Sequence, residues 1–163
     1  MAHLQNATFD LKIAREKEWI GMAYEAFTEE WAKEWAKHLN QNQNYRKVAA
    51  TWEWPLVLRV EKDESVGLDE DRAIYLDLWH GECREARAAT EEDLEKAPYV
   101  VSADPYTWKL IFERKLEPIS TLMRGRLKLV KGDMSTLSGY VMAAKYLLED
   151  ALKVETEIPE GLK

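Results

Sequence analysis

The chain has 163 residues, of which 46% are hydrophobic and 33% charged, and it carries a formal net charge of −7. This length and composition predict one globular domain over residues 1–163, which buries roughly two thirds of the surface of its unfolded chain. The excess of acidic residues argues against a nucleic-acid partner, because affinity for phosphate backbones comes mainly from clustered Lys and Arg.

Cysteine content and hydropathy indicate the compartment. Cys83 is the single cysteine, so no intramolecular disulfide can form and a reducing environment is expected. No apolar run approaches the ~20 residues needed to span a bilayer. The first residues also lack the apolar core of a signal peptide. We therefore expect a cytoplasmic protein without stable insertion into a membrane.

Residues 13–39 carry apolar side chains at steps of three and four, which predicts a long N-terminal helix. The Asn and Gln run at residues 40–44 ends it, because these side chains compete for backbone hydrogen bonds. We interpret residues 1–50 as a helical extension and residues 52–152 as the core. Tryptophan is unusually frequent, which predicts a core of large side chains or the rigid wall of a cavity or interface. The seven are Trp19, Trp31, Trp35, Trp52, Trp54, Trp79 and Trp108.

From residue 52 the hydrophobic period changes to two, as is typical of strands. Residues 56–60, 73–79 and 82–89 alternate between apolar and polar side chains, with a turn at Gly81 between the last two. Pro55 lacks a backbone donor and is expected at the start of a strand or on a sheet edge. The pattern predicts an antiparallel meander with one solvent-exposed face.

Short helices and strands alternate in the second half of the core. Thr90 and Asp93 fit a capping motif for one helical turn, and Asp104 followed by Pro105 is typical of a helix start. The later elements are expected as a strand over 99–103, helices over 105–116 and 118–125, a strand over 126–132 and a long C-terminal helix over 133–152.

The segment GRLKLVKGDMST places a glycine beside a lysine ahead of hydroxyl side chains, as a phosphate-binding loop does. A P-loop needs Gly-Lys followed directly by Ser or Thr, whereas here Lys131 precedes Gly132 and Asp133 follows it. An aspartate at a helix N-terminus also occupies the positive end that a phosphate would use. We therefore interpret Gly132 as a turn out of a strand, and Asp133 or Ser135 as a helix cap.

Residues 99–148 resemble the signature region of the sterol carrier protein type 2 family. The family pattern is an aspartate-led aromatic helix, a Lys-Leu-acidic-Pro link, a Met-X-Gly ending, a strand closed by Gly-Asp, and a long helix. The resemblance implies an α/β (α+β) fold whose five-stranded, largely antiparallel sheet is covered by helices. It also implies an apolar tunnel for a fatty acid, fatty acyl-CoA, sterol or isoprenoid-like lipid, and no catalysis. The matching residues are Asp104, Trp108, Lys115, Leu116, Pro118, Met123, Gly125, Leu127, Gly132 and Asp133.

The C-terminal helix carries two apolar stripes, whereas an ordinary surface helix buries one. The second stripe indicates deep burial, a partner or a ligand. Unbranched methionines suit a variable apolar guest, although they equally fill gaps in a core. The predicted ligand-binding wall consists of Trp108, Ile111, Phe112, Leu122, Met123, Leu129, Met134, Leu137, Val141 and Met142.

Arg124 and Arg126 belong to a local excess of positive charge in an acidic chain. This cluster is either a solvated face or a site for an acidic headgroup beside the tunnel.

A catalytic reading would start from His80 and Cys83. In an extended strand their side chains would point to opposite faces, so a structural cysteine is favoured over a nucleophile. The chain has no spacing typical of metal ligands, so we expect no metal, no cofactor and no enzymatic activity.

We therefore predict an intracellular carrier that binds a hydrophobic small molecule or lipid by burying apolar surface. The alternative is a non-enzymatic interaction or dimerisation module of the same fold with a collapsed cavity. In that alternative Trp31 and Trp35 form the interface of a homodimer.

Overall fold

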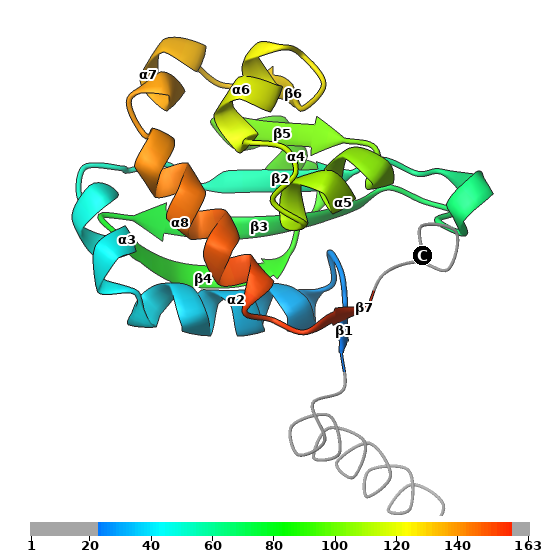
Figure 1. Ribbon diagram of the computed structural model, residues 1–163, viewed down its shortest axis with the longest axis horizontal. Coiled ribbons are helices and arrows are strands. Elements are labelled where there is room, and N and C mark those ends of the chain that lie inside the picture. The colour runs from blue at the N-terminus through cyan, green and yellow to red at the C-terminus, as the bar shows by residue number, and fades with distance from the viewer. Residues whose placement is uncertain (1–22, 158–163) are drawn as a thin grey trace, which may run out of the picture.

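The computed structural model of the protein describes residues 23–157. These residues form a five-stranded sheet that is covered mainly on one face by helices, with a separate two-stranded sheet beside it (Figure 1). The strands are β1 (Tyr24–Glu25), β2 (Leu56–Val60), β3 (Arg72–Trp79), β4 (Glu82–Ala88), β5 (Tyr99–Ala103), β6 (Lys128–Lys131) and β7 (Thr156–Glu157). The helices are α2 (Glu29–Gln41), α3 (Gln43–Val48), α4 (Glu91–Lys96), α5 (Pro105–Phe112), α6 (Pro118–Met123), α7 (Met134–Ser138) and α8 (Val141–Leu152), with a 3-10 turn, η1, at Glu64–Val66.

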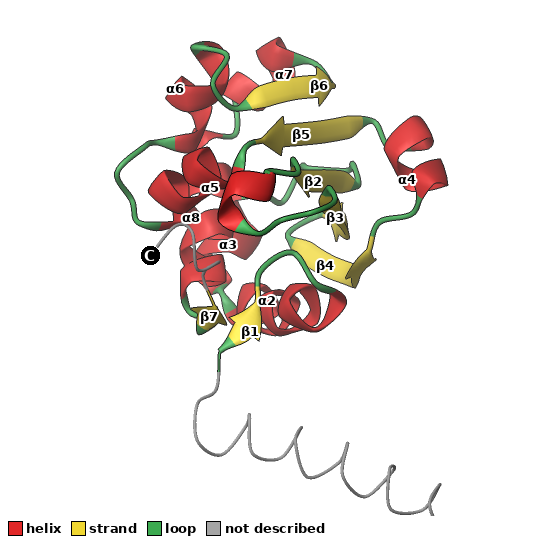
Figure 2. Cartoon of the chain, turned by 90° about the vertical axis from the view of Figure 1, so that its right-hand side faces the viewer, coloured by secondary structure: helices red, strands yellow, loops and turns green. Residues whose placement is uncertain are grey.

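The large sheet has the strand order β4-β3-β2-β5-β6. Its pairs are antiparallel except β2 with β5, which run parallel with Leu58 opposite Val101. The connection from β2 to β5 passes through the β3–β4 hairpin and α4, which lies on the side of the sheet opposite α8 (Figure 2). The predicted fold class is confirmed, and so is the antiparallel meander of β2, β3 and β4.

The inner face of the sheet supplies the main core. Leu56, Leu58 and Val60 alternate along β2 and are buried in it, as the period of two predicts. Val57 points the other way and packs with Val100 in a small separate cluster under α4. Pro55 directly precedes β2, where no ladder hydrogen bond is lost.

The first helix of the described chain starts at Glu29, so the prediction of helix from residue 13 is wrong over residues 23–28. Thr28 caps α2 by accepting a hydrogen bond from the Trp31 N–H at 3.4 Å. Phe27 adopts a φ of 60°, which a non-glycine residue in a helix does not have. Residues 13–22 of the predicted helix lie outside the described residues.

The predicted C-terminal helix is two helices, α7 and α8. Asp133 is the cap of α7 and accepts a hydrogen bond from the Thr136 N–H at 3.0 Å. Gly139 ends α7 and is not in the middle of a helix. The break turns Tyr140 inward, where its ring meets the Trp52 ring edge-on at 5.0 Å and its hydroxyl bonds to Thr51. These contacts explain why the helix does not continue.

Gly132 is required where the chain leaves β6. Its φ is 131°, and a Cβ at this position would lie 2.4 Å from the Tyr99 ring. The interpretation of this glycine as a turn residue is confirmed.

Buried polar contacts join α2 and α3 to α8. The Trp35 indole N–H donates to the Leu147 carbonyl at 2.8 Å. Asp150 is fully buried, accepts from the Asn42 amide at 2.9 Å and pairs with Lys153 at 2.8 Å. Because the ring of Trp35 is fully buried and Trp31 is 1% exposed, the prediction that these two residues form a subunit interface is wrong.

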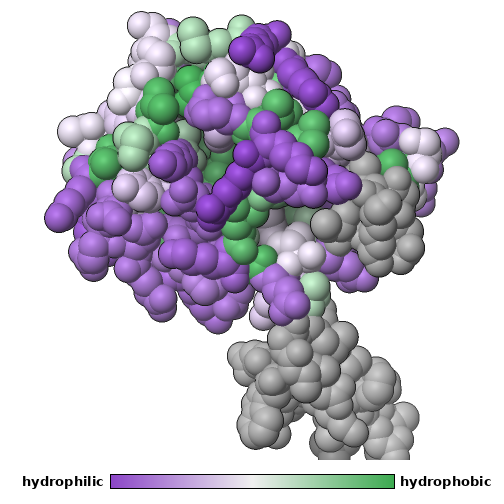
Figure 3. Space-filling view, viewed as in Figure 1, coloured by the Kyte–Doolittle hydropathy of each residue, from purple (hydrophilic) through white to green (hydrophobic). Residues whose placement is uncertain are grey.

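On the helix-covered face, apolar surface gathers over α6, α7 and the start of α8, while the surface of α2 is polar (Figure 3). The exposed apolar side chains there include Met123, Val141 and Met142.

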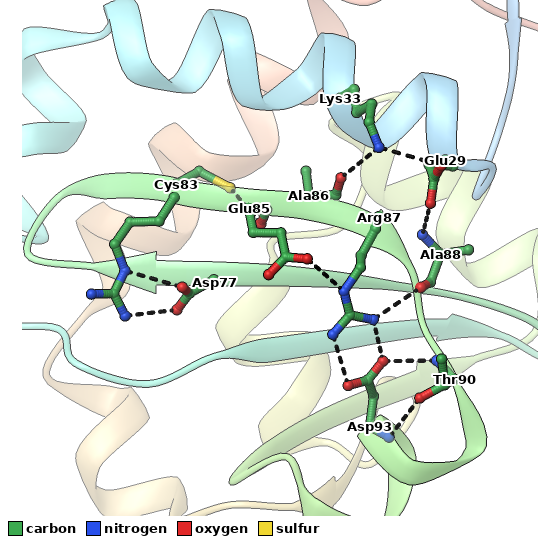
Figure 4. A network of polar contacts seen from close by, with 11 residues as sticks. Glu29, Lys33, Asp77, Cys83, Glu85, Ala86, Arg87, Ala88, Thr90 and Asp93 are labelled. Atoms are coloured by element: carbon green, nitrogen blue, oxygen red, sulfur yellow. Dashed lines mark hydrogen bonds and ion pairs between the residues drawn. The ribbon is translucent and has the colours of Figure 1, made fainter.

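Ion pairs order the outer side of β4 (Figure 4). Arg87 donates to both oxygens of Asp93 and, at 2.8 Å, to Glu85. Asp93 also closes a capping box with Thr90 at the start of α4, as the sequence predicts. Glu29 of α2 accepts a hydrogen bond from the Ala88 N–H at 3.1 Å. This bond satisfies a backbone donor at the end of β4, which is an edge strand of the sheet.

Candidate functional site

Two cavities lie between the sheet and the helices. The large cavity has a volume of about 590 Å³ and is lined by residues of α2, α5, the end of β2, the loop around η1 and the chain that follows α8. The small cavity, about 90 Å³, lies between the inner face of the sheet and helices α6, α7 and α8.

Aromatic rings form one wall of the large cavity. Phe27 stacks on Trp31 at 5.1 Å between ring centroids and tilts against Trp108 at 5.2 Å. Phe112 stacks on Trp108 at 5.8 Å and meets Trp31 edge-on. Such rings offer a large apolar surface with little freedom to collapse. The aliphatic residues of the lining are Val60, Val66, Leu68, Leu152 and Val154.

Charged residues also line the large cavity, and carboxylates outnumber cations. Arg72 is held by Glu25, with a nitrogen–oxygen distance of 3.0 Å, and by the Ala26 carbonyl at 3.3 Å. An anionic headgroup at this rim would meet unfavourable charge, whereas an uncharged headgroup would not. The cations are Arg72 and Lys109, and the carboxylates are Glu25, Glu113, Glu155 and Glu157.

The small cavity is almost wholly apolar. Its floor is the inner face of the sheet, with Leu58 and Val101, and its roof is α8, with Ala144 and Leu148. Its volume is below the roughly 300–1,000 Å³ of ordinary ligand pockets, so it does not hold a lipid by itself.

The two cavities lie end to end. Leu58 and Val60 share one face of β2, and they line the small and the large cavity respectively. Leu148 and Leu152 lie one turn apart on α8, and they too line the small and the large cavity respectively. Of the described residues, Trp108 alone lines both cavities.

The predicted wall residues divide into three groups. Phe112 lines the large cavity, Leu122 and Leu137 line the small one, and Trp108 lines both. The second group lines neither cavity and packs on or in the core: Ile111, Leu129 and Met134. The third group is exposed at the surface, with exposed fractions of 66% for Met123, 40% for Val141 and 44% for Met142.

Several lining residues were not predicted from the sequence, among them Phe27, Trp31, Leu68 and Val154. They come from segments that are far apart in the chain, and no local pattern connects them. The tryptophan frequency was the one available signal, since Trp31, Trp52 and Trp108 all line a cavity.

Arg124 and Arg126 line neither cavity. Arg124 is the exposed C-cap residue of α6. Arg126 donates to the Thr107 hydroxyl at 3.1 Å and lies over the Tyr106 ring at 5.8 Å. A headgroup role for this pair stays a prediction.

Cys83 is placed for structure and not for nucleophilic chemistry. It is buried and donates to the Glu85 carbonyl at 3.3 Å. Burial raises the pKa of its thiol to about 12, so the thiolate is scarce at neutral pH. His80 is not in a strand but in the β3–β4 turn, where its φ is 50° and its imidazole lies 3.5 Å from Glu53.

Residues 23–157 contain neither a cluster of metal ligands nor a helix that could span a membrane. No group of three or more His, Cys, Asp or Glu in that range is arranged to hold a metal ion. None of the helices described there has the length and apolar character to cross a bilayer.

Comparison with known proteins places the chain in a family. The profile of the SCP-2 sterol transfer family matches residues 33–145. A crystal structure of sterol carrier protein 2 is 44% identical, with a TM-score of 0.72 over 80% of this chain and 99% of that one. A conserved hypothetical protein from Thermus thermophilus, suggested to be a sterol carrier protein, is 42% identical, with a TM-score of 0.74 over 83% of this chain and 94% of that one.

A third structure, the apo form of sterol carrier protein 2 from Yarrowia lipolytica, is 16% identical with a TM-score of 0.50, covering 74% of this chain and 88% of that one. It supports the fold alone. No curated protein sequence matches the chain. The profile match covers more than half of the chain and the first two structures align over most of it, so the protein belongs to the SCP-2 sterol transfer family.

Proposed function

We propose that the protein is a non-enzymatic carrier that binds one hydrophobic molecule in the large cavity. The observation that carries this proposal is the cavity itself. Its volume of about 590 Å³ falls within the roughly 300–1,000 Å³ of ligand pockets, and rigid rings form its wall. Each methylene group buried there contributes about 0.8 kcal/mol, which a long apolar ligand accumulates against the cost of association.

The relatives support a lipid as the ligand class, because two structures above 40% identity are described as established or suggested sterol carrier proteins. The candidates are a fatty acid, a fatty acyl-CoA, a sterol or an isoprenoid-like lipid. The excess of carboxylates at the rim of the large cavity favours a ligand with an uncharged headgroup, such as a sterol or an isoprenoid alcohol.

Mass spectrometry of the freshly purified protein, native and after organic extraction, tests the proposal. We expect a lipid that co-purifies in stoichiometric amount and that is recovered in the extract. An apo mass, with no gain after addition of cholesterol, farnesol or palmitate, would contradict a carrier function.

A second candidate function is an interaction module of the same fold. The small volume of the cavity beneath α8, about 90 Å³, favours it, because the space there is largely filled by side chains. Size exclusion with light scattering separates the two. A module should form the same homodimer before and after complete delipidation, whereas a monomer at both stages would exclude a dimerisation function.

A further inference from the structure

We infer that Trp108 divides one continuous apolar tunnel into two compartments and thereby limits the length of the ligand. The small cavity is the second compartment, which would receive the far end of a chain if the indole ring were absent. The inference rests on the proposed carrier function and adds a residue that sets specificity.

The two cavities are aligned along the same elements of the fold. They follow each other along the same face of β2 and along α8, and the side chain of Trp108 contributes to both linings. The rigid indole ring of Trp108 therefore separates the large cavity from the small one. Removal of the ring would join about 590 Å³ to about 90 Å³ and to the volume of the indole itself.

The ring of Trp108 is held in a fixed position. Trp108 is 3% exposed, and its indole N–H donates to the Arg59 carbonyl on β2 at 2.9 Å. Phe27 and Phe112 contact the ring from the side of the large cavity. A ligand that displaced the ring would leave the buried N–H without its acceptor, which is unfavourable.

The backbone beneath the ring is held as well. Asp104 caps α5 by accepting from the Thr107 N–H at 2.9 Å, and Pro105 fixes the first turn. Trp108 therefore projects from an anchored helix and not from a loop. It follows that compact ligands, or chains that end at the ring, fit the native protein better than long unbranched chains.

The affinities of octanol, dodecanol, hexadecanol and octadecanol, measured by displacement of a fluorescent probe, test this. In the native protein, Kd should fall with chain length and then level off. In Trp108→Leu it should keep falling beyond that length, by up to about four-fold per added methylene. Trp79→Leu, which removes an indole ring that lines neither cavity, is the matched control and should keep the native profile.

A second variant reports on the small cavity. Ala144 lines only that cavity, so Ala144→Phe should fill it from α8 and leave the native profile unchanged. In the double variant that combines Trp108→Leu with Ala144→Phe, the added ring should cancel the gain in affinity for long-chain alcohols. Should Trp108→Leu fail to fold, Trp108→Met, whose longer and more adaptable side chain fills gaps better, takes its place in both experiments.

The outcomes are separable. If native protein and Trp108→Leu bind no alcohol of any length, the carrier function fails. If the native protein binds and Trp108→Leu keeps the native profile, the partition is wrong. If Ala144→Phe alone weakens binding of octadecanol to otherwise native protein, the ring already swings aside and the fixed partition is wrong.

Discussion

The two faces of the central sheet are built from different chemistry. The inner face is apolar and meets aromatic side chains from α2 and α5, with two cavities between the layers. Around β4, the outer face carries paired charges. Arg84 donates to both oxygens of Asp77, and Arg87 donates to Asp93 (Figure 4). The inner face can leave space unfilled because rigid aromatic rings hold its walls apart, whereas the ion pairs of the outer face fix the edge of the sheet at β4. We therefore expect changes on the inner face to alter stability or binding strongly, and changes on the outer face to alter stability weakly and with pH.

The largest effect is expected for Trp35→Ala on the inner side. It removes a fully buried ring and the hydrogen bond that joins α2 to the Leu147 carbonyl. The free energy of unfolding should fall by about 3–5 kcal/mol, measured by denaturant titration. Trp79→Ala is the control, because this ring is 38% exposed and should cost under about 1 kcal/mol. Equal losses would mean that the two faces do not differ as described.

Filling the large cavity should weaken ligand binding without unfolding the protein. Leu152 lines it from α8 and is partly buried, so Leu152→Trp adds a ring to open space. Ligand affinity should drop by at least about ten-fold, which is a loss of roughly 1.4 kcal/mol. Val141→Trp and Met142→Trp are controls on the exposed side of the same helix. If they reduce lipid capacity and Leu152→Trp does not, the ligand lies beneath the surface over α6, α7 and the start of α8.

A pH effect is expected on the outer face. The hydrogen bond from Arg87 lowers the pKa of Asp93 from 3.8 to about 2. The folded carboxylate therefore adds stability that is fully present above pH 3.8 and is lost as the pH falls towards 2. Solvent screening limits the contribution to about 1 kcal/mol.

Arg87→Gln should remove that contribution and flatten the acid limb of a stability profile recorded by chemical denaturation. Lys96→Gln breaks an exposed pair with Glu92 and should leave the limb unchanged. An acid limb of native steepness in Arg87→Gln would show that another carboxylate is responsible.

The smallest effect is expected for the double change Arg124→Gln and Arg126→Gln. Neither residue lines a cavity, so the affinity for palmitate relative to hexadecanol should change by less than about two-fold at physiological salt. Fluorescence displacement measures both affinities. A selective loss of palmitate binding would restore these arginines as a headgroup site.

Local chemistry made much of the fold predictable from the sequence. Asp104 with Pro105, Thr90 with Asp93, and Gly132 with Asp133 each determine a turn or cap within a few residues, and each is found where predicted. The alternation of apolar residues also placed the inner face of β2. Such features depend on neighbours in the chain, which a sequence displays.

Features that depend on distant partners were not predictable. The break at Gly139 follows from contacts of Tyr140 with Trp52 and Thr51, and nothing local requires it. The helical spacing of apolar residues includes Phe27, although Phe27 lies before the start of α2 and lines the large cavity. An apolar side chain suits either place, so the spacing did not show where the helix begins. Trp108 and Phe112 were predicted from the sequence as wall residues, yet the residues opposite them could be assigned only from the structure.

The parallel pairing of β1 with β7 has a consequence for synthesis on the ribosome. Tyr24 and Thr156 are partners in that pair, and the Trp31 indole N–H donates to the Thr156 hydroxyl at 2.9 Å. The large cavity is therefore lined by residues near 25–31 and 151–157, which are far apart in the sequence and leave the ribosomal exit tunnel at different times. Until the later segment emerges, Phe27 and Trp31 have no complete surface to pack against, and a nascent chain exposes them to chaperones. If the protein is the proposed carrier, a ligand finds a complete cavity only after residues 151–157 have left the ribosomal exit tunnel.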